Sequence, residues 1–264
     1  MISTTLYYLQ LIHLYSQDEI TVLLKWIIES KGEGKSDEFY LNILSQLKSG
    51  KPIQYVLGET IFYGLKFSVN KNTLIPRPET EELVHLIIGE NKNQPISILD
   101  IGTGSGCIAI TLQKKLPLTN VFGFDIDENA ITLAKQNAKL NKVNIGFTLA
   151  DALNLQPKNY PKYDIIVSNP PYVTHTEKAT MSSQVLDFEP HLALFVPDEN
   201  PLIFYDCISD FALTNLSPQG KLYFEINQYL GLVTQKMLEH KGFSATLIKD
   251  INGNHRIISA QLRG

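Results

Sequence analysis

The sequence predicts an α/β protein, in which a mostly parallel seven-stranded sheet carries helices on both faces and follows a small N-terminal helical domain. Two observations lead to this fold class. From residue 96 onward, short apolar segments of strand type alternate with segments of helical periodicity, which is typical of a parallel sheet with crossover helices. Residues 1–57, by contrast, show helical periodicity only. We therefore expect two structural units of different character.

The helical domain expected over residues 1–57 contains apolar residues at helical spacing. The stripes of its first two helices are made of Leu6, Leu9, Ile12 and His13, then Ile20, Leu23, Leu24, Ile27 and Ile28. Ser16, followed by Gln17-Asp18-Glu19, predicts a capped start for the second helix, and Lys31-Gly32-Glu33-Gly34 predicts its end. A third helix is expected over Asp37 to Leu47. We expect the stripes to form the core of this domain.

A β-hairpin linker is expected over residues 58–75. Within it, the segment 60–69 predicts two short strands that turn near Gly64. The next segment is extended and then enters a helix, for which Glu79 or Thr80 is the expected start.

The α/β domain is expected over residues 76–264. Its strands are predicted at 96–101, 121–125, 145–149, 163–168, 221–226, 243–249 and 255–262. The last two strands are joined near Asn252-Gly253-Asn254, and we expect them to form an antiparallel pair at the edge of the sheet.

The tetrapeptide Asn169-Pro170-Pro171-Tyr172 directly follows the apolar strand segment 163–168. Proline lacks an amide donor and has a fixed φ, so the strand stops here and the chain turns rigidly. The Asn169 side chain and the Pro170 carbonyl are then held at the carboxyl end of the strand, where open α/β sheets bind ligands. Two acceptors beside an aromatic ring suit a planar NH2 group. This pattern predicts a site for an exocyclic amine or a carboxamide.

A glycine-rich segment, Gly102-Thr103-Gly104-Ser105-Gly106, lies between the first α/β strand and a helical pattern. Such a loop lets the backbone approach a ligand closely at a helix N-terminus. A dinucleotide-binding fingerprint would place its third glycine where Cys107 stands, which disfavours NADH or NADPH. The following strand ends in Asp125, a carboxylate placed to accept hydrogen bonds from ribose hydroxyls. This order resembles the S-adenosylmethionine site of Rossmann-like methyltransferases.

Composition narrows the classes of function. The 264 residues carry a net charge of −4, which argues against a protein that grips nucleic acid through broad phosphate neutralisation. The two cysteines and six histidines show no metal-ligand spacing, so no metal is expected. The chain has no signal-type segment and no apolar run that could span a bilayer. We expect a monomeric cytoplasmic protein that binds neither membranes nor nucleic acid directly.

Several motifs together resemble the release-factor glutamine N5-methyltransferase family, also known as PrmC or HemK. The matching pieces cover nearly the whole chain and are Gly58-Glu59, Phe62-Tyr63-Gly64, Leu74-Ile75-Pro76-Arg77-Pro78-Glu79-Thr80-Glu81, Leu99 to Cys107, Ser168 to Tyr172, Glu189-Pro190 with Ala193-Leu194, and Phe224-Glu225-Ile226. The Pro-Arg-Pro-Glu-Thr segment ahead of the glycine loop is the most specific of these, because many methyltransferases share the other two main motifs.

The resemblance implies methyl transfer from S-adenosylmethionine to the side-chain amide of the glutamine in the Gly-Gly-Gln motif of class 1 peptide chain release factors. It implies that the cofactor is held by Gly102, Thr103, Gly104, Ser105, Gly106, Asp125, Asp151, Ala152 and Asn169. Asn169, Pro170 and Tyr172 would be catalytic, and with Pro171 they would bind the glutamine amide. The N-terminal helical domain would recognise the release factor.

Three positions depart from the family pattern, namely Ala152, Asn227 and His255. Three other functions stay open at this point: glutamine methylation of a ribosomal protein, adenine-N6 methylation of a nucleic acid, and cofactor binding without catalysis. Adenine is also a planar conjugated amine, so the tetrapeptide alone does not separate protein from nucleic acid as the substrate.

Four charged residues have open roles at this stage. Asp100 is expected either to orient the glycine loop or to lie near the sulfonium. Arg77 and Glu79 are expected either to pair near the cofactor entrance or, as charges flanked by proline, to have a structural role. Glu225 ends a strand on the ligand side and is expected to bind a ligand, cap a helix or brace a loop.

Overall fold

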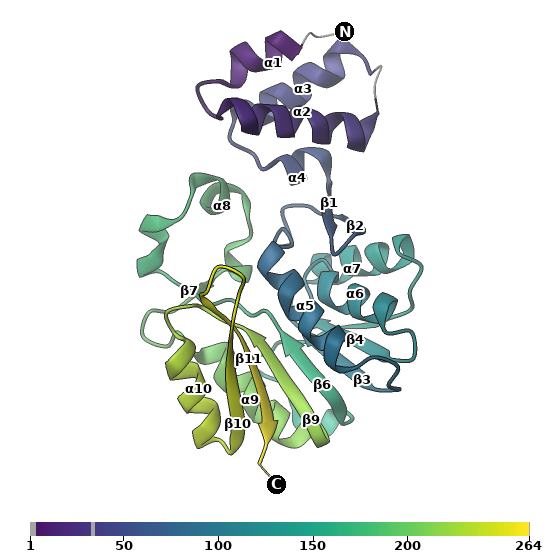
Figure 1. The fold of residues 1–264 in the computed structure, drawn as a ribbon, viewed down its shortest axis with the longest axis vertical. Helices are drawn as coiled ribbons and strands as arrows, with labels where there is room; N and C mark the ends of the chain where they lie inside the picture. Colours follow the sequence, from purple (N-terminus) through teal and green to yellow (C-terminus); the bar gives the residue numbers. More distant parts are fainter. Residues whose placement is uncertain (1–3, 33–34, 264) are drawn as a thin grey trace.

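The computed structural model describes residues 4–32 and 35–263. The N-terminal helices α1 to α4 form one end of an elongated molecule, and the α/β domain forms the rest (Figure 1). No helix in these two ranges is long and apolar enough to cross a membrane.

The N-terminal helices are α1 (Thr4–Leu11), α2 (Gln17–Lys31), α3 (Asp37–Lys48) and α4 (Ile53–Leu57). The start of α2 is confirmed, because Ser16 and Glu19 form a capping box with reciprocal hydrogen bonds. Glu33 and Gly34 of the predicted stop lie outside the described residues. The core of this domain consists of Tyr7, Leu11, Ile20, Leu23, Ile27, Ile43, Leu44, Leu47, Ile53 and Leu57.

The predicted stripe of α1 was wrong. Leu9 is 66% exposed and Ile12 is 50% exposed, whereas Tyr7 and Leu11 are buried. The helix ends at Leu11, so Ile12 lies in the following turn and cannot continue a helical stripe. The side chain of Leu6 lies outside the described part of the chain. In α2 the stripe holds except at Ile28, which is exposed.

The predicted hairpin is confirmed as β1 (Glu59–Phe62) and β2 (Leu65–Ser68). Its two turn residues, Tyr63 and Gly64, both have positive φ, at 50° and 74°, as a tight hairpin turn requires. The hairpin is held against α7 (Glu128–Leu140), because the Asn137 side chain bonds both the N–H and the carbonyl of Ser68.

The sheet of the α/β domain has seven strands in the order β10-β11-β9-β6-β3-β4-β5. Its strands are β3 (Ser97–Ile101), β4 (Asn120–Asp125), β5 (Gly146–Leu149), β6 (Tyr163–Ser168), β9 (Leu216–Glu225), β10 (Phe243–Lys249) and β11 (His255–Leu262). Strands β9, β6, β3, β4 and β5 are parallel, and β11 and β10 continue the sheet antiparallel. The mostly parallel sheet and its antiparallel edge are confirmed.

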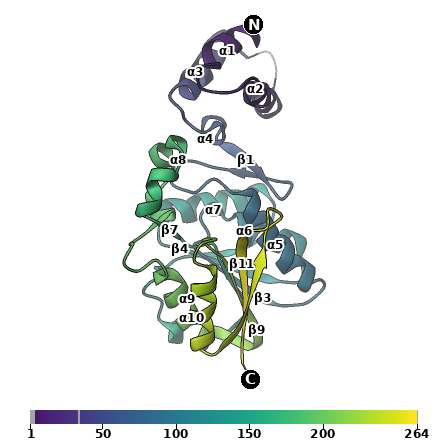
Figure 2. The same ribbon diagram turned by 60° about the vertical axis from the view of Figure 1, so that its left-hand side comes forward.

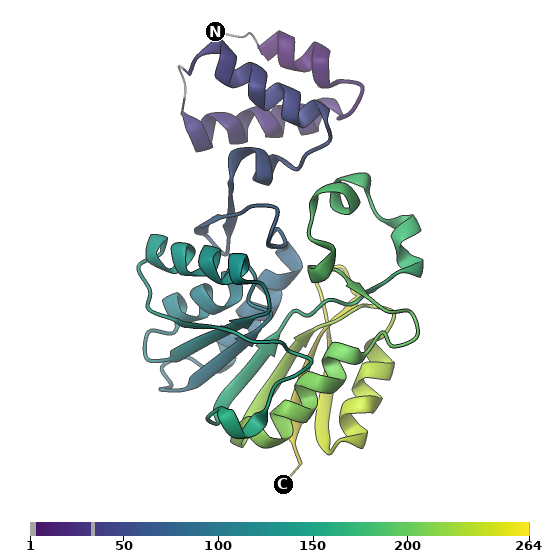
Figure 3. The same ribbon diagram turned by 180° about the vertical axis from the view of Figure 1, so that it is seen from behind.

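Helices cover both faces of this sheet, as expected (Figure 3). One face packs against α5 (Pro78–Glu90), α6 (Cys107–Lys115) and α7, and the other against α9 (Ile203–Asn215) and α10 (Gly231–His240). Successive side chains of a strand point to opposite faces of the sheet. Ile98 therefore packs in the core between the sheet and α5 and α6, and Leu99 packs in the core between the sheet and α9 and α10. The expected start of α5 was off by one or two residues: the helix begins at Pro78, a residue favoured at the first helical position.

One long connection was not predicted. Residues 173–196, which we name the arm, leave the sheet after β6 and return before α9. The arm is closed at its base by a two-stranded pair, β7 (Val173–Thr174) and β8 (Phe195–Val196), and carries α8 (Ser183–Phe188). Its helix lies beside the N-terminal domain (Figure 2), where Gln184 donates a hydrogen bond to the Tyr15 hydroxyl at 3.2 Å. The arm therefore connects the two units.

Candidate active site

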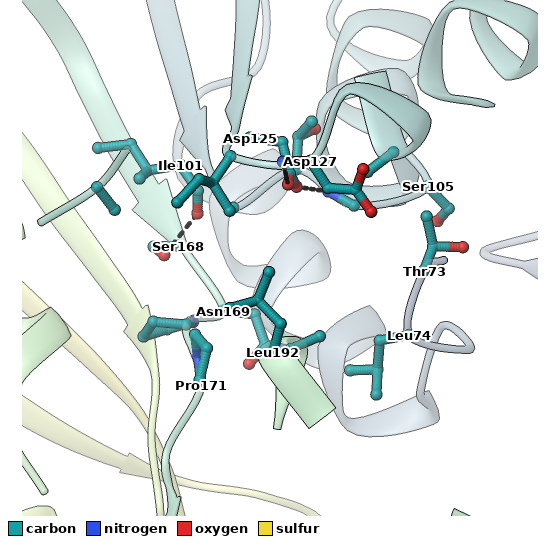
Figure 4. Close-up of a pocket in the computed structure, with 18 of the residues that line it drawn as sticks. Thr73, Leu74, Ile101, Ser105, Asp125, Asp127, Ser168, Asn169, Pro171 and Leu192 are labelled. Atoms are coloured by element: carbon teal, nitrogen blue, oxygen red, sulfur yellow. Dashed lines mark hydrogen bonds between the residues drawn. The ribbon is translucent and has the colours of Figure 1, made fainter. Parts of the chain in front are cut away.

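A cavity of about 230 Å³ lies at the carboxyl ends of β3, β4 and β6. The chain order in the sheet reverses between β3 and β6, and ligands of open α/β sheets bind at such a reversal. Ser168 fastens the two strands together there, since its hydroxyl donates to the Ile101 carbonyl at 2.6 Å. Figure 4 shows this bond at one wall of the cavity, with Asp125 and Asp127 on another and Thr73 and Leu74 across from them.

At Gly102 and Gly104 of the glycine loop, the backbone itself lines the cavity. Gly102 and Gly104 have φ values of 76° and 54°, and nothing lies within 4 Å of the position that a Cβ would take on either. Thr103 and Ser105 also line the cavity, and the Ser105 hydroxyl is buried without a hydrogen-bond partner among residues 4–32 and 35–263. A ligand could therefore approach the backbone closely and bond to that hydroxyl.

Gly106 differs from the rest of the loop, because it is not among the residues that line the cavity. It has a φ of 81°, and a Cβ there would lie 2.8 Å from Cδ1 of Ile110 and 3.3 Å from Cβ of Ala134. Glycine at this position allows α6 to pack closely against α7, which is a structural rather than a ligand-binding reason for the residue.

Asp100 orients the glycine loop. Its buried carboxylate accepts hydrogen bonds from the Thr103 hydroxyl at 2.7 Å and from the Ala109 amide at 3.3 Å. Burial raises the pKa of Asp100 to about 7, although these two hydrogen bonds oppose the rise. Of the two expected roles, the contacts favour the bracing of the loop.

Asp125 lies where the sequence predicts, at the end of β4 and in the cavity wall. One carboxylate oxygen accepts from the Gly104 amide at 2.7 Å, and the other accepts from the Asp127 amide at 3.0 Å. Burial raises its pKa. Each oxygen keeps a further lone pair that can accept from a ligand hydroxyl.

The remaining predicted cofactor residues, Asp151 and Ala152, also line the cavity. Asp151 braces its own turn, because it accepts hydrogen bonds from the Leu153 amide and the Asn154 side chain. Ala152 contributes apolar surface and packs against the core.

Sequence reasoning missed several other lining residues, among them Thr80, Ile126, Asp127, Leu192 and Phe204. Asp127 could have been found from its position, because it caps the helix that follows the second strand of the domain. No local pattern marks the apolar ones, since they come from separate loops and helices.

The tetrapeptide after β6 lies between the large cavity and a smaller one of about 50 Å³, and Asn169 and Pro170 line both. Pro171 lines the large cavity and Tyr172 the small one. Asn169 donates through its side-chain NH2 group to the Thr80 hydroxyl at 3.2 Å. The structure thus brings the predicted catalytic residues together at the junction of the two cavities.

Glu225 holds this tetrapeptide in place through hydrogen bonds. It is buried at the end of β9 and accepts hydrogen bonds from the hydroxyls of Thr80, at 2.6 Å, and Tyr172, at 3.2 Å. Burial raises the pKa of Tyr172, so its phenol remains a donor. Asn227, one of the departures from the family pattern, donates to the Tyr172 carbonyl at 3.1 Å and so holds the same segment.

The expected pair of Arg77 and Glu79 was wrong. Arg77 instead forms an ion pair with Glu189 of the arm, which also accepts a hydrogen bond from the Ile75 amide at 3.2 Å. Arg77 precedes the first turn of α5 in an extended conformation, and the arm places Glu189 beside it. Arg77 lines both cavities.

Comparisons with known proteins support this picture. The family model of the methyltransferase small domain matches residues 83–188. A methyltransferase from Pyrococcus furiosus has a similar fold, with a TM-score of 0.56 at 19% identity over 77% of this chain and 91% of that one. The release factor glutamine methyltransferase of Flavobacterium psychrophilum is 54% identical over 226 residues, or 84% of this chain and 79% of that protein. The protein of that name from Bacteroides thetaiotaomicron is 49% identical, over 83% and 79% of the two chains.

The sheet order and the structural neighbour define the fold as an open α/β sheet of the Rossmann-like type. The matched domain, together with the curated relatives, defines the class of protein as a methyltransferase. The similarity to the two curated proteins narrows this class. The chain belongs to the release factor glutamine methyltransferase family, which confirms the resemblance that its motifs indicated.

Proposed function

We propose that this enzyme transfers a methyl group from S-adenosylmethionine to the side-chain amide nitrogen of the glutamine in the Gly-Gly-Gln motif of class 1 peptide chain release factors. One observation carries the proposal: a chain 54% identical to a release factor glutamine methyltransferase has Asn169 and Pro170 at the junction of the two cavities. Two acceptors at that junction suit a carboxamide NH2 group that faces a bound methyl donor.

The residues of the large cavity fit S-adenosylmethionine. Gly102 and Gly104 allow the methionine portion to approach the backbone, and the unpartnered hydroxyl of Ser105 is available to it. Asp125 would accept from the ribose hydroxyls, and Asp151 and Ala152 would flank the adenine. When bound, the cofactor supplies a methyl group activated by its positively charged sulfur.

The protein contributes placement and electrostatics. A carboxamide nitrogen is a poor nucleophile, because its lone pair is delocalised into the carbonyl. Asn169 and Pro170 each accept one N–H of the substrate amide, while Tyr172 and Pro171 shape the pocket around it. These acceptors orient the nitrogen and stabilise the positive charge that develops on it.

The N-terminal helical domain, which we assign to residues 1–57, recognises the body of the release factor. Residues 58–75 link it to the methyltransferase domain at 76–264. The hydrogen bond between Gln184 and Tyr15 supports these separate roles for the two domains, because it joins the N-terminal domain to the arm beside the candidate active site. We place the reaction in the cytoplasm, with a monomer acting directly on a protein.

The test is mass spectrometry of an unmodified class 1 release factor after incubation with the enzyme and S-adenosylmethionine. We expect a single added methyl group on the glutamine of Gly-Gly-Gln. If the release factor stays unmethylated while the enzyme binds the cofactor, the assignment fails. Ribosomal proteins and then adenine in DNA would be the next substrates to test.

A further inference from the structure

Three side chains from distant parts of the sequence form a hydrogen-bonded chain that ends at the candidate acceptor site. Glu225 ends β9, Thr80 lies in the first turn of α5, and Asn169 follows β6. The Thr80 hydroxyl donates to Glu225 at 2.6 Å, and the Asn169 NH2 group donates to the Thr80 oxygen at 3.2 Å. Thr80 and Glu225 are 2% and 1% exposed, so the bond between them is buried, whereas the bond from Asn169 lies at the cavity wall.

The direction of this chain follows from the chemistry of its members. An ionised carboxylate only accepts hydrogen bonds, and a threonine hydroxyl has a single proton. Thr80 uses that proton to donate a hydrogen bond to Glu225, which accepts a second hydrogen bond from the Tyr172 hydroxyl. Burial raises the pKa of Glu225, but the hydroxyls of Thr80 and Tyr172, together with the positive charge of Arg256, oppose this rise. The oxygen of Thr80 is left able only to accept.

This restriction determines which end of the Asn169 amide faces the substrate. The amide carries its NH2 group and its carbonyl oxygen on opposite sides. Because Thr80 accepts, Asn169 turns its NH2 group toward Thr80, and its carbonyl oxygen turns away from that hydroxyl. A rotated amide would instead present an NH2 group to the NH2 group of the substrate, and two donors cannot form a hydrogen bond.

We propose that Thr80 is a positioning residue for methyl transfer, which holds the Asn169 amide with its carbonyl oxygen toward the substrate nitrogen. The inference rests on the proposed function, in which Asn169 accepts from the glutamine amide. Glu225 then orients two parts of the acceptor site at once, Tyr172 directly and Asn169 through Thr80.

The experiment compares Thr80→Val, which keeps the shape but loses the hydroxyl, with Thr80→Ser, which keeps the hydroxyl. Both are assayed on the intact release factor with S-adenosylmethionine, and methylated glutamine is quantified by mass spectrometry. We expect Thr80→Val to lower kcat by about 10²-fold with little change in the Kd for S-adenosylmethionine. Thr80→Ser should retain most of the turnover.

Thr111→Val is the matched control. Thr111 is also a fully buried threonine, but its hydroxyl has no hydrogen-bond partner in the part of the chain that the structure describes, and it does not line the cavity. The kcat of Thr111→Val should therefore stay at the wild-type value. If Thr80→Val does not fold, as judged by thermal unfolding and cofactor binding, Thr80→Ala replaces it with the same expected loss.

A double-mutant cycle separates positioning from a general structural effect. In an Asn169→Ala background the amide is absent, so adding Thr80→Val should lower kcat no further. Losses that multiply would overturn the inference, as would a Thr80→Val enzyme within a few-fold of wild-type kcat. A wild-type enzyme that leaves the release factor unmethylated would overturn the proposed function, and this inference with it.

Discussion

At the scale of single residues, the candidate acceptor site depends on the direction of hydrogen bonds. Asn169 does not titrate, and burial raises the pKa of Tyr172 so that its phenol remains a donor to Glu225. Under the proposed function, these groups affect the rate by placing the acceptor nitrogen and by stabilising charge on it, because the methyl donor already carries the activated group.

The first residue-scale prediction concerns Asn169. Asn169→Ala removes one of the two proposed acceptors, and loss of one such partner typically lowers kcat by about 10²–10³-fold. Single-turnover methylation of a release factor measures this loss. Asn252→Ala, in the exposed turn between β10 and β11, is the control and should behave as wild type. Wild-type turnover in Asn169→Ala would remove Asn169 from the mechanism.

The second prediction concerns Asp100, whose pKa burial raises to about 7 in the folded protein. An unfolded aspartate titrates near pH 4, so between about pH 4 and pH 7 the folded state binds more protons than the unfolded state. The contribution of Asp100 to the free energy of unfolding therefore falls as the pH rises through this window.

Asp100→Asn mimics the protonated form and does not titrate, so its free energy of unfolding should lack this dependence on pH. We expect the free energy of unfolding of the wild type, relative to that of Asp100→Asn, to decrease between about pH 4 and pH 7. Urea unfolding at several pH values measures it. Parallel pH profiles for the two proteins would show that Asp100 does not titrate differently on folding.

At the scale of elements, the arm contacts the hairpin linker and the residue that precedes α5. Phe188 packs with Tyr55, Val69 and Ile75 beside the hairpin linker, and Glu189 pairs with Arg77. The arm is thus held by the apolar contacts of Phe188 and by the ion pair of the buried Glu189 carboxylate.

Glu189→Ala should destabilise the fold by about 1–3 kcal/mol, because it leaves the Ile75 amide and the Arg77 guanidinium without this partner. The midpoint of urea unfolding gives the value. Asp187→Ala removes an exposed carboxylate from the same arm and should change the stability by less than about 0.5 kcal/mol. Equal effects of the two substitutions would contradict a specific role for Glu189.

At the scale of the whole molecule, the N-terminal domain carries exposed apolar side chains that its own core does not use. Val22 and Trp26 are examples, at 49% and 38% exposure, four residues apart on α2. Residues at that spacing share one face of a helix. This face is a candidate for contact with the release factor under the proposed function.

The double substitution Val22→Ser and Trp26→Ala should raise KM for a full-length release factor by about tenfold or more, since buried aromatic anchors dominate interface energies. Methylation of a short Gly-Gly-Gln peptide should be unaffected, because such a peptide lacks the body of the release factor that is proposed to contact α2. Ile61→Ser, at an exposed position of β1 outside this domain, is the control. An unchanged KM for the full-length substrate would place recognition elsewhere.

Local pattern predicted much of this protein correctly. Buried parallel strands are apolar runs bounded by turn residues, so β3, β4 and β6 and the loops at their ends could be located from sequence. The glycine loop and the segment 169–172 are equally local, because glycine and proline restrict the backbone wherever they occur. Family and chemistry followed from these contiguous motifs.

Contacts between distant segments were decided only by the tertiary structure. Thr80, Asn169 and Glu225 are widely separated in the chain and meet because α5 begins, and β6 and β9 end, at one edge of the sheet. The pairing of Arg77 with Glu189, instead of Glu79, depends on where the arm returns. Likewise, the buried face of α1 depends on what packs against it. Sequence determines local conformation through backbone restriction and periodicity, whereas partners and buried faces depend on how the elements meet in space.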